Sequence, residues 1–343
     1  MFLNTDYIEP AELTGFARAA LADLDENQFT LSRWLPNTLV DDLEYRFTRG
    51  GAEGLMRAAT FRAYDTEARM TKRPGVSRVS GELPPISRKI RLGEYDRLRQ
   101  RKLEAKIGDQ IFGDAERVVR EIAARLEIAR GQALVTGTVS INEDGVVASV
   151  DFGRNAAHTV TLSGTDLWSD LDDSDPVEDL LTWSETYSNN NQGREPGAIV
   201  TSKQVVSLLI RNEKVRNYIF NGQPGGPAIV TRDALQAVLT AHGLPQIYTY
   251  EAQVIPDGGS ATRVIAADKV LLLPAPGDDS AGRTLYGTPA ESFEPDYGLA
   301  GEEAGIVSGV YRSVDPVALW THASAIALPI LGDPDLTFVA DVL

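Results

Sequence analysis

Hydrophobic residues recur every three or four positions along residues 109–130, the period of an α-helix with one apolar face. The stripe consists of Ile111, Ala115, Val118, Val119, Ile122, Leu126 and Ala129. Acidic residues lie towards the start of this segment and Arg125 and Arg130 towards its end, which suits the helix dipole. Gly131 follows, and a glycine is the usual residue that ends a helix. We predict a helix of roughly 33 Å that ends at Gly131 and forms a spine against which a sheet packs.

Shorter patterns predict the other elements. Helices are expected at 10–24, 177–187, 203–211, 215–220 and 233–242, with Ser174 or Asp175, Thr201 or Ser202, and Thr231 as N-caps of the second, third and fifth. Strands are expected at 58–64, 86–92, 133–141, 146–152, 199–200, 244–255, 263–266, 270–274, 305–312, 317–331 and 336–343. Predicted strands predominate before and after a segment of helices and strands at roughly 166–260, and we expect an α+β fold in two lobes.

Two strand pairs have a predicted arrangement. The strands 58–64 and 86–92 flank a polar segment broken by Pro74, Gly75 and Gly81, which predicts a projecting hairpin. The strands at 133–141 and 146–152 are joined by a turn at Asp144-Gly145 and are expected to enter the sheet under the spine helix. If the final strand pairs near residue 140, residues 166–260 form an inserted second lobe.

Charge is distributed unevenly along the 343 residues. The net charge is −16, but residues 57–106 carry 14 Lys and Arg against 6 Asp and Glu, which leaves 19 against 43 elsewhere. A basic segment on an acidic body is typical of proteins that bind nucleic acid or an acidic protein. The segment has few aromatic residues for stacking bases, and the acidic body would repel phosphate. We therefore favour a protein partner, including another copy of this chain, over a merely solvated basic surface.

Composition excludes several classes. There is no cysteine, so disulfides and thiolate metal sites are absent. No apolar run reaches the 18 residues of a membrane helix, and the first ten residues carry Asp6 and Glu9 where a signal peptide is basic. We expect a soluble protein that is not exported and does not contact a membrane.

The search for catalytic or metal-binding residues finds little. His158, His242 and His322 lie far apart without metal-ligand spacing, and residues 172–179 are acidic but lack the spacing of a calcium loop. We interpret the acidic residues as the start of a helix. The glycine-rich segment 221–228 lacks the Gly-Lys-Ser/Thr of a phosphate loop. No catalytic motif, cofactor site or metal site is predicted, and a structural building block is favoured over an enzyme.

Three stretches carry a resemblance to a known family. They are VDFGRNAAHTVTLSGTDLWSD at 150–170, KVLLLPAPGDDSAGRTLYGTPAE at 269–291 and SAIALPILGDPDLTFVADVL at 324–343. In order and spacing, from about residue 58 onwards, the sequence resembles the lambda-type tailed-phage major capsid proteins of the phage major capsid protein E family. The first 45 residues match weakly.

The resemblance implies the Hong Kong 97 phage capsid fold. It implies an N-terminal arm at 1–57, an E-loop hairpin at 58–92, a P-domain at 93–165 and 261–325 with the spine helix at 109–130, and an A-domain at 166–260 and 326–343. It also implies assembly through hexamers and pentamers into an icosahedral head around double-stranded DNA, which would be held by non-specific contact. A portal, a scaffold and a decoration protein are the expected further partners.

Five basic residues are the predicted contacts between subunits, namely Arg69, Lys72, Arg73, Arg88 and Lys89. Arg88 and Lys89 stand at the base of the predicted hairpin and are expected to face an adjacent subunit. Two other functions stay open at this point. One is an encapsulin-type bacterial nanocompartment shell, which shares the fold and encloses cargo; the other is a monomeric acidic enzyme, which would gather carboxylates in a concave pocket.

Overall fold

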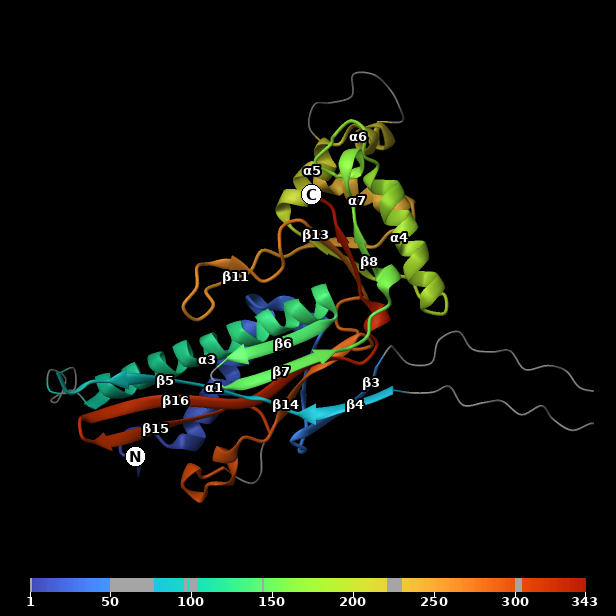
Figure 1. Cartoon of the computed structure of the whole chain (residues 1–343). Coiled ribbons are helices and arrows are strands. Elements are labelled where there is room, and N and C mark those ends of the chain that lie inside the picture. The colour runs from blue at the N-terminus through green and yellow to red at the C-terminus, as the bar shows by residue number, and fades with distance from the viewer. Residues whose placement is uncertain are drawn as a thin grey trace, which may run out of the picture.

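The computed structural model of the chain describes residues 2–49, 77–95, 98, 104–143, 145–220, 230–299 and 304–343. These residues form an elongated lower lobe along helix α3 (Glu104–Thr136) and an upper lobe that stands over one end of it (Figure 1). Helices and strands are mixed in both lobes, so the predicted α+β class is confirmed.

The lower lobe is built on a six-stranded sheet. Its order is β1–β15–β16–β14–β2, and β5 also pairs with β16. The bounds are β1 (Phe2–Leu3), β2 (Asn37–Leu39), β5 (Pro85–Leu92), β14 (Gly282–Gly287), β15 (Val307–Val314) and β16 (Val317–Leu331). Residues 319–324 of β16 pair with β5 and with β15, so these two strands lie on opposite sides of β16.

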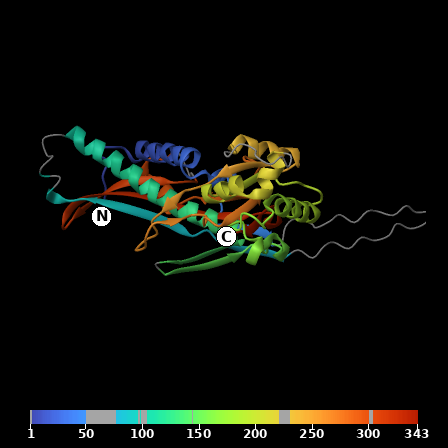
Figure 2. The ribbon, with the colours of Figure 1, turned by 90° about the horizontal axis from the view of Figure 1, so that it is seen from above.

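Two helices cover one face of this sheet. Helix α3 runs along the sheet, and α1 (Pro10–Asn27), followed by the short η1 (Thr30–Arg33), lies beside it (Figure 2). All seven residues of the predicted apolar stripe are buried. Four of them, Val118, Val119, Ile122 and Leu126, share a core cluster with Ala323 and Ala325 of β16. The stripe of α3 therefore determines where the sheet packs, as the periodicity predicts.

The predicted end of the spine helix at Gly131 is wrong, because α3 continues to Thr136. Gly137 ends it instead, with a φ of 67° that favours glycine. Gly131 serves a different purpose, since a Cβ built on it would lie 2.6 Å from Val264 Cγ1. The missing side chain lets the segment after β12 (Thr262–Arg263) approach the helix closely.

Two further strand pairs differ from the sequence prediction. β6 (Thr138–Glu143) and β7 (Val146–Asp151) form the predicted hairpin, but among the described strands they pair only with each other. β3 (Glu44–Arg49) pairs with β4 (Ser77–Glu82). The strand predicted at 86–92 exists as β5, yet its partner is β16, while the predicted strand at 58–64 lies outside the described residues. The final strand does not pair near residue 140 either, because β17 (Phe338–Asp341) pairs with β13 (Lys269–Leu273) and with β8 (Thr159–Thr161).

The upper lobe contains a five-stranded sheet of order β10–β9–β13–β17–β8. The bounds are β8 (Thr159–Thr161), β9 (Ala198–Thr201), β10 (Gln246–Thr249), β13 (Lys269–Leu273) and β17 (Phe338–Asp341). The helices are α4 (Pro176–Asn190), α5 (Lys203–Arg211), α6 (Glu213–Ile219) and α7 (Arg232–Ala241). Asp175, Ser202 and Thr231 accept the capping hydrogen bonds of α4, α5 and α7, which confirms the predicted caps.

Short elements connect the two lobes. They are η2 (Ala156–His158), between β7 and β8, and η6 (Pro334–Leu336), between β16 and β17. The other short elements are β11 (Gln253–Val254), η3 (Gly164–Asp166), and η4 (Ala290–Phe293) and η5 (Pro295–Tyr297), the last two between β14 and β15 of the lower lobe. The chain passes between the lobes after β7, after β13 and after β16. One buried hydrophobic cluster includes Ala133 of α3, Leu328 of β16 and Leu271 of β13, so the two lobes share a core. None of the described helices has both the length and the apolar character needed to cross a bilayer.

Candidate inter-subunit surface

The five basic residues predicted to contact a neighbouring subunit fall in two places. Arg69, Lys72 and Arg73 lie outside the described residues. Arg88 and Lys89 lie on β5, which pairs with β16 and with no other described strand. Side chains alternate between the faces of a strand, so these two neighbours point in opposite directions.

Arg88 lies on the face of the sheet that carries α3. Its guanidinium is 2.5 Å from the carboxylate of Asp257, beyond β11, and 3.6 Å from that of Glu121 on α3. The Arg88 side chain is 47% exposed, so each pair contributes little stability. The structure thus gives the Arg88 charge acidic partners within its own chain.

Lys89 lies on the opposite face, beside an aromatic ring. Its Nζ atom is 5.1 Å from the ring centroid of Trp320 on β16, and Cζ of Arg91 is 5.8 Å from the same centroid. Both cations are exposed, and Trp320 Nε1 donates a hydrogen bond to Ser313 Oγ at 3.2 Å. Nothing in the sequence singles out Arg91 or Trp320, because only the register of β5 on β16 brings them together.

A segment of opposite charge lies on the other side of β16. Its described residues, 284–299 and 304–311, contain three Asp and Glu and no Lys or Arg. Within η4 and η5, Phe293 is 56% exposed, and Glu294 and Asp296 are exposed as well. Tyr297 anchors this segment, because its hydroxyl contacts that of Tyr311 on β15.

A buried charged cluster joins α1, α3 and β14. Arg130 Nη1 donates to Asp25 at 2.7 Å and to Glu127 at 3.1 Å, and its Nε donates to Thr284 at 3.0 Å. The Arg130 and Glu127 side chains are 1% and 0% exposed. Arg130, one of the charged residues near the end of the predicted helix, therefore lies in the interior.

The pKa values in this cluster reflect burial and mutual attraction. Burial alone would lower the pKa of Arg130, but the carboxylates of Asp25 and Glu127 raise it above its usual value. Burial raises the pKa of Glu127, against the opposing effect of Arg130. Glu127 also accepts hydrogen bonds from Tyr250 Oη at 2.6 Å and from the Leu31 amide at 3.0 Å. The cluster is a fully hydrogen-bonded joint rather than a site open to a ligand.

A second polar joint connects the lower lobe to the upper one. Arg154 donates to the carbonyl oxygens of Leu134 and Val135, at 2.8 and 2.5 Å, and so caps the end of α3. Burial lowers the pKa of Arg154 to about 10, although Asp335 opposes this shift. His158 is buried nearby, and burial lowers its pKa too.

His158 accepts a hydrogen bond at Nε2 from Asn190 (2.9 Å), while its Nδ1 lies 3.3 Å from the Thr337 carbonyl oxygen. His322 is also largely buried, and His242 is exposed at the end of α7. The three histidines lie in different parts of the fold, and the described residues contain no group of three or more His, Asp or Glu side chains suited to a metal ion.

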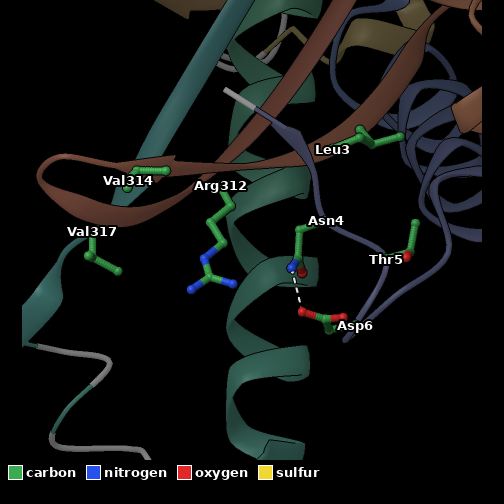
Figure 3. Close-up of a pocket in the computed structure, with 7 residues that line it drawn as sticks. All are labelled: Leu3, Asn4, Thr5, Asp6, Arg312, Val314 and Val317. Carbon is green, nitrogen blue, oxygen red and sulfur yellow. Dashed lines mark hydrogen bonds between the residues drawn. The ribbon is translucent and has the colours of Figure 1, made fainter.

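One hollow of the described surface, of about 320 Å³, lies where β1 meets the β15–β16 turn (Figure 3). Asn4 donates to Asp6 at 2.7 Å there, and Arg312 points into the same hollow. This hollow gathers a single carboxylate and no histidine, so it lacks the converging carboxylates that the enzyme hypothesis requires.

The chain is similar to known proteins in both sequence and structure. The family model described as phage major capsid protein E matches residues 51–342. A phage-related protein from Bordetella bronchiseptica RB50 is similar in structure, with a TM-score of 0.60, 17% identity and 98% of both chains covered. The putative capsid protein of a prophage of Escherichia coli CFT073 has a TM-score of 0.65 and 13% identity, over 98% of this chain and 99% of that one.

An encapsulin from Synechococcus elongatus PCC 7942, solved as a holo complex, has a TM-score of 0.50 and 13% identity over 92% of this chain and 88% of that one. No curated protein matches the sequence significantly. These likenesses show the fold, which is the Hong Kong 97 capsid fold that phage capsids and encapsulins share.

Proposed function

The chain belongs to the phage major capsid protein E family, and from this premise we propose that it assembles through hexamers and pentamers into the icosahedral head of a tailed double-stranded DNA phage. A major capsid role, in the capsid of the virion, follows from the family itself. The observation that carries the proposal is that the family model spans residues 51–342, both lobes included. Assembly would take place in the host cytoplasm.

We assign the parts of the fold accordingly. The lower lobe with α3 as spine helix would be the P-domain, and the upper lobe with α4–α7 the A-domain at the centre of each capsomer. Residues 1–57 would supply the N-terminal arm and 58–92 the E-loop. The pairing of β3 with β4 and of β5 with β16 favours an E-loop based on β3 and β4, with β5 counted in the P-domain.

Charge supports packaging of DNA inside such a shell. Outside residues 57–106 the chain carries 19 Lys and Arg against 43 Asp and Glu. A wall of this charge attracts DNA weakly, so the genome would touch it without specific binding. A portal, a scaffold and a decoration protein are the further partners that we propose from the family. Arg69, Lys72, Arg73, Arg88 and Lys89 remain proposed contacts between subunits.

An encapsulin-type shell is the second candidate, because the Synechococcus elongatus encapsulin shares the fold over 92% of this chain. The two functions differ in what the shell encloses. A phage head holds DNA, whereas a nanocompartment holds cargo protein.

The test is to express the full chain, alone and with the scaffold encoded beside it, and to examine it by negative-stain microscopy and mass photometry. Closed shells or capsomer rings are expected. Particles from the phage-producing host should contain nuclease-protected DNA, and protected cargo protein without DNA would favour the nanocompartment instead. A monodisperse monomer of about 37 kDa under every condition would contradict both functions.

A further inference from the structure

The lower lobe is electrically polarised across its sheet. On one side, β5 carries Arg88, Lys89 and Arg91 and no acidic residue. The described residues 284–299 and 304–311, on the other side of β16, carry Glu291, Glu294 and Asp296 and no basic residue. Because β5 and β15 flank β16 on opposite sides, the basic and the acidic segments occupy opposite sides of the sheet.

Four exposed charged side chains, two on β5 and two within residues 293–296, have no ionic partner among the described residues. The ion pairs among the described residues include none made by Lys89, Arg91, Glu294 or Asp296. Arg88 differs, since Asp257 and Glu121 already face its charge. An aromatic side chain lies beside each set of charges: Trp320 of β16, which is half-buried, next to the two cations, and the exposed Phe293 next to Glu294. Aromatic residues surrounded by charge are typical anchors of protein interfaces.

The strand that carries the cations is open along its backbone. β5 is eight residues long and pairs with β16 alone among the described strands. Such an edge leaves half of its amide and carbonyl groups directed outward, where another chain can lie against them. The acidic segment of the same chain lies on the far side of β16, beyond β15. It therefore leaves this edge uncovered.

We propose that neighbouring copies meet head to tail, with the β5 edge of one copy, Lys89, Arg91 and Trp320, receiving segment 293–296 of the next copy. This inference rests on the proposed function, and it names the pair of surfaces by which subunits join within a capsomer. Because the two surfaces differ, a joined pair still has one free β5 edge and one free segment 293–296. Further copies can bind there, and the repeated rotation closes a ring. The opposite charges would fix the direction in which the copies join.

Charge exchange tests the proposal. Lys89→Glu/Arg91→Glu and Glu294→Lys/Asp296→Lys each place like charges together, and each should raise the protein concentration needed for rings about tenfold or more. A chain carrying all four substitutions should assemble within about threefold of wild type, because the attraction is restored with reversed sign. Arg117→Glu/Arg120→Glu on α3 changes the net charge as much as the first variant, at exposed positions that the proposed contact does not use, and is the matched control.

The readouts are mass photometry for rings and shells, at low and high salt, and circular dichroism for the fold of each variant. Rescue by the fourfold variant supports the proposal, because a misfolded variant would not recover. If wild type assembles and the two reversed variants assemble equally well, or if the fourfold variant is as defective as either, this inference is overturned while the capsid function stands. If wild type itself never assembles, the proposed function fails and the inference fails with it.

Discussion

Replacement of Arg130 by methionine should destabilise the unassembled chain by about 4 kcal/mol. Methionine fills similar space but removes every donor of a side chain that is 1% exposed. Asp25 and Glu127 would then share a buried site without a cation, and the loss of one partner of a buried ion pair costs about 3–5 kcal/mol. Arg130→Lys keeps the charge but not the planar group that reaches Thr284 and Asn37 as well, so about half of that cost is expected.

The measurement is urea unfolding followed by tryptophan fluorescence. Arg120 on the same helix provides the control, since it pairs with Glu116 at 2.9 Å while 53% exposed. Arg120→Met should cost less than about 0.5 kcal/mol, as exposed helix pairs do. If Arg130→Met and Arg120→Met lowered the free energy of unfolding equally, burial of the ion pair would not explain the cost, and this reasoning would be refuted.

Three other predictions can be checked with the same unfolding curves. Gly131→Ala should destabilise by about 1–3 kcal/mol through the clash with Val264, whereas Gly113→Ala, where nothing lies within 4 Å, should stabilise by about 0.5–1 kcal/mol. Because burial lowers the pKa of His158, only the unfolded chain binds that proton just below about pH 6.5; stability should therefore fall as the pH drops, and His158→Gln should reduce this fall. Arg154→Leu should cost about 2–3 kcal/mol and speed amide exchange in the last turn of α3, a change that unaltered exchange would contradict.

Local signals predicted the elements whose determinants are local. Helix α5 begins and ends at the predicted residues, because its amphipathic period and its N-cap agree. Strand β16 also spans the predicted range. The strand predicted at 244–255 divides into β10 and β11, since alternation alone does not show where a strand leaves its sheet. The family, and with it the fold, was recognised from ordered motifs rather than from periodicity.

Features that depend on distant partners were not predictable in this way. In the sequence, Gly131 resembles the residue that ends a helix. The close approach of Val264 gives the actual reason for a glycine at this position. Arg130 has the composition of an exposed helix face, yet Asp25, 105 positions earlier, makes its burial possible. Among the candidate contacts, the basic character of β5 was apparent from sequence, but the pairing of Arg88 with Asp257 and the placement of Arg91 on Trp320 required the register of the sheet.

The repeated crossings between the lobes limit how a closed shell can curve. A hinge that bends freely contains a single connection or two and little shared packing. Here the chain crosses after β7, β13 and β16, Arg154 ties the end of α3 to Thr337, and one hydrophobic cluster extends into both lobes. We expect the described lobes to tilt as one rigid plate, so the difference in angle between a pentamer and a hexamer would arise at the seams between copies and not by flexing inside each copy.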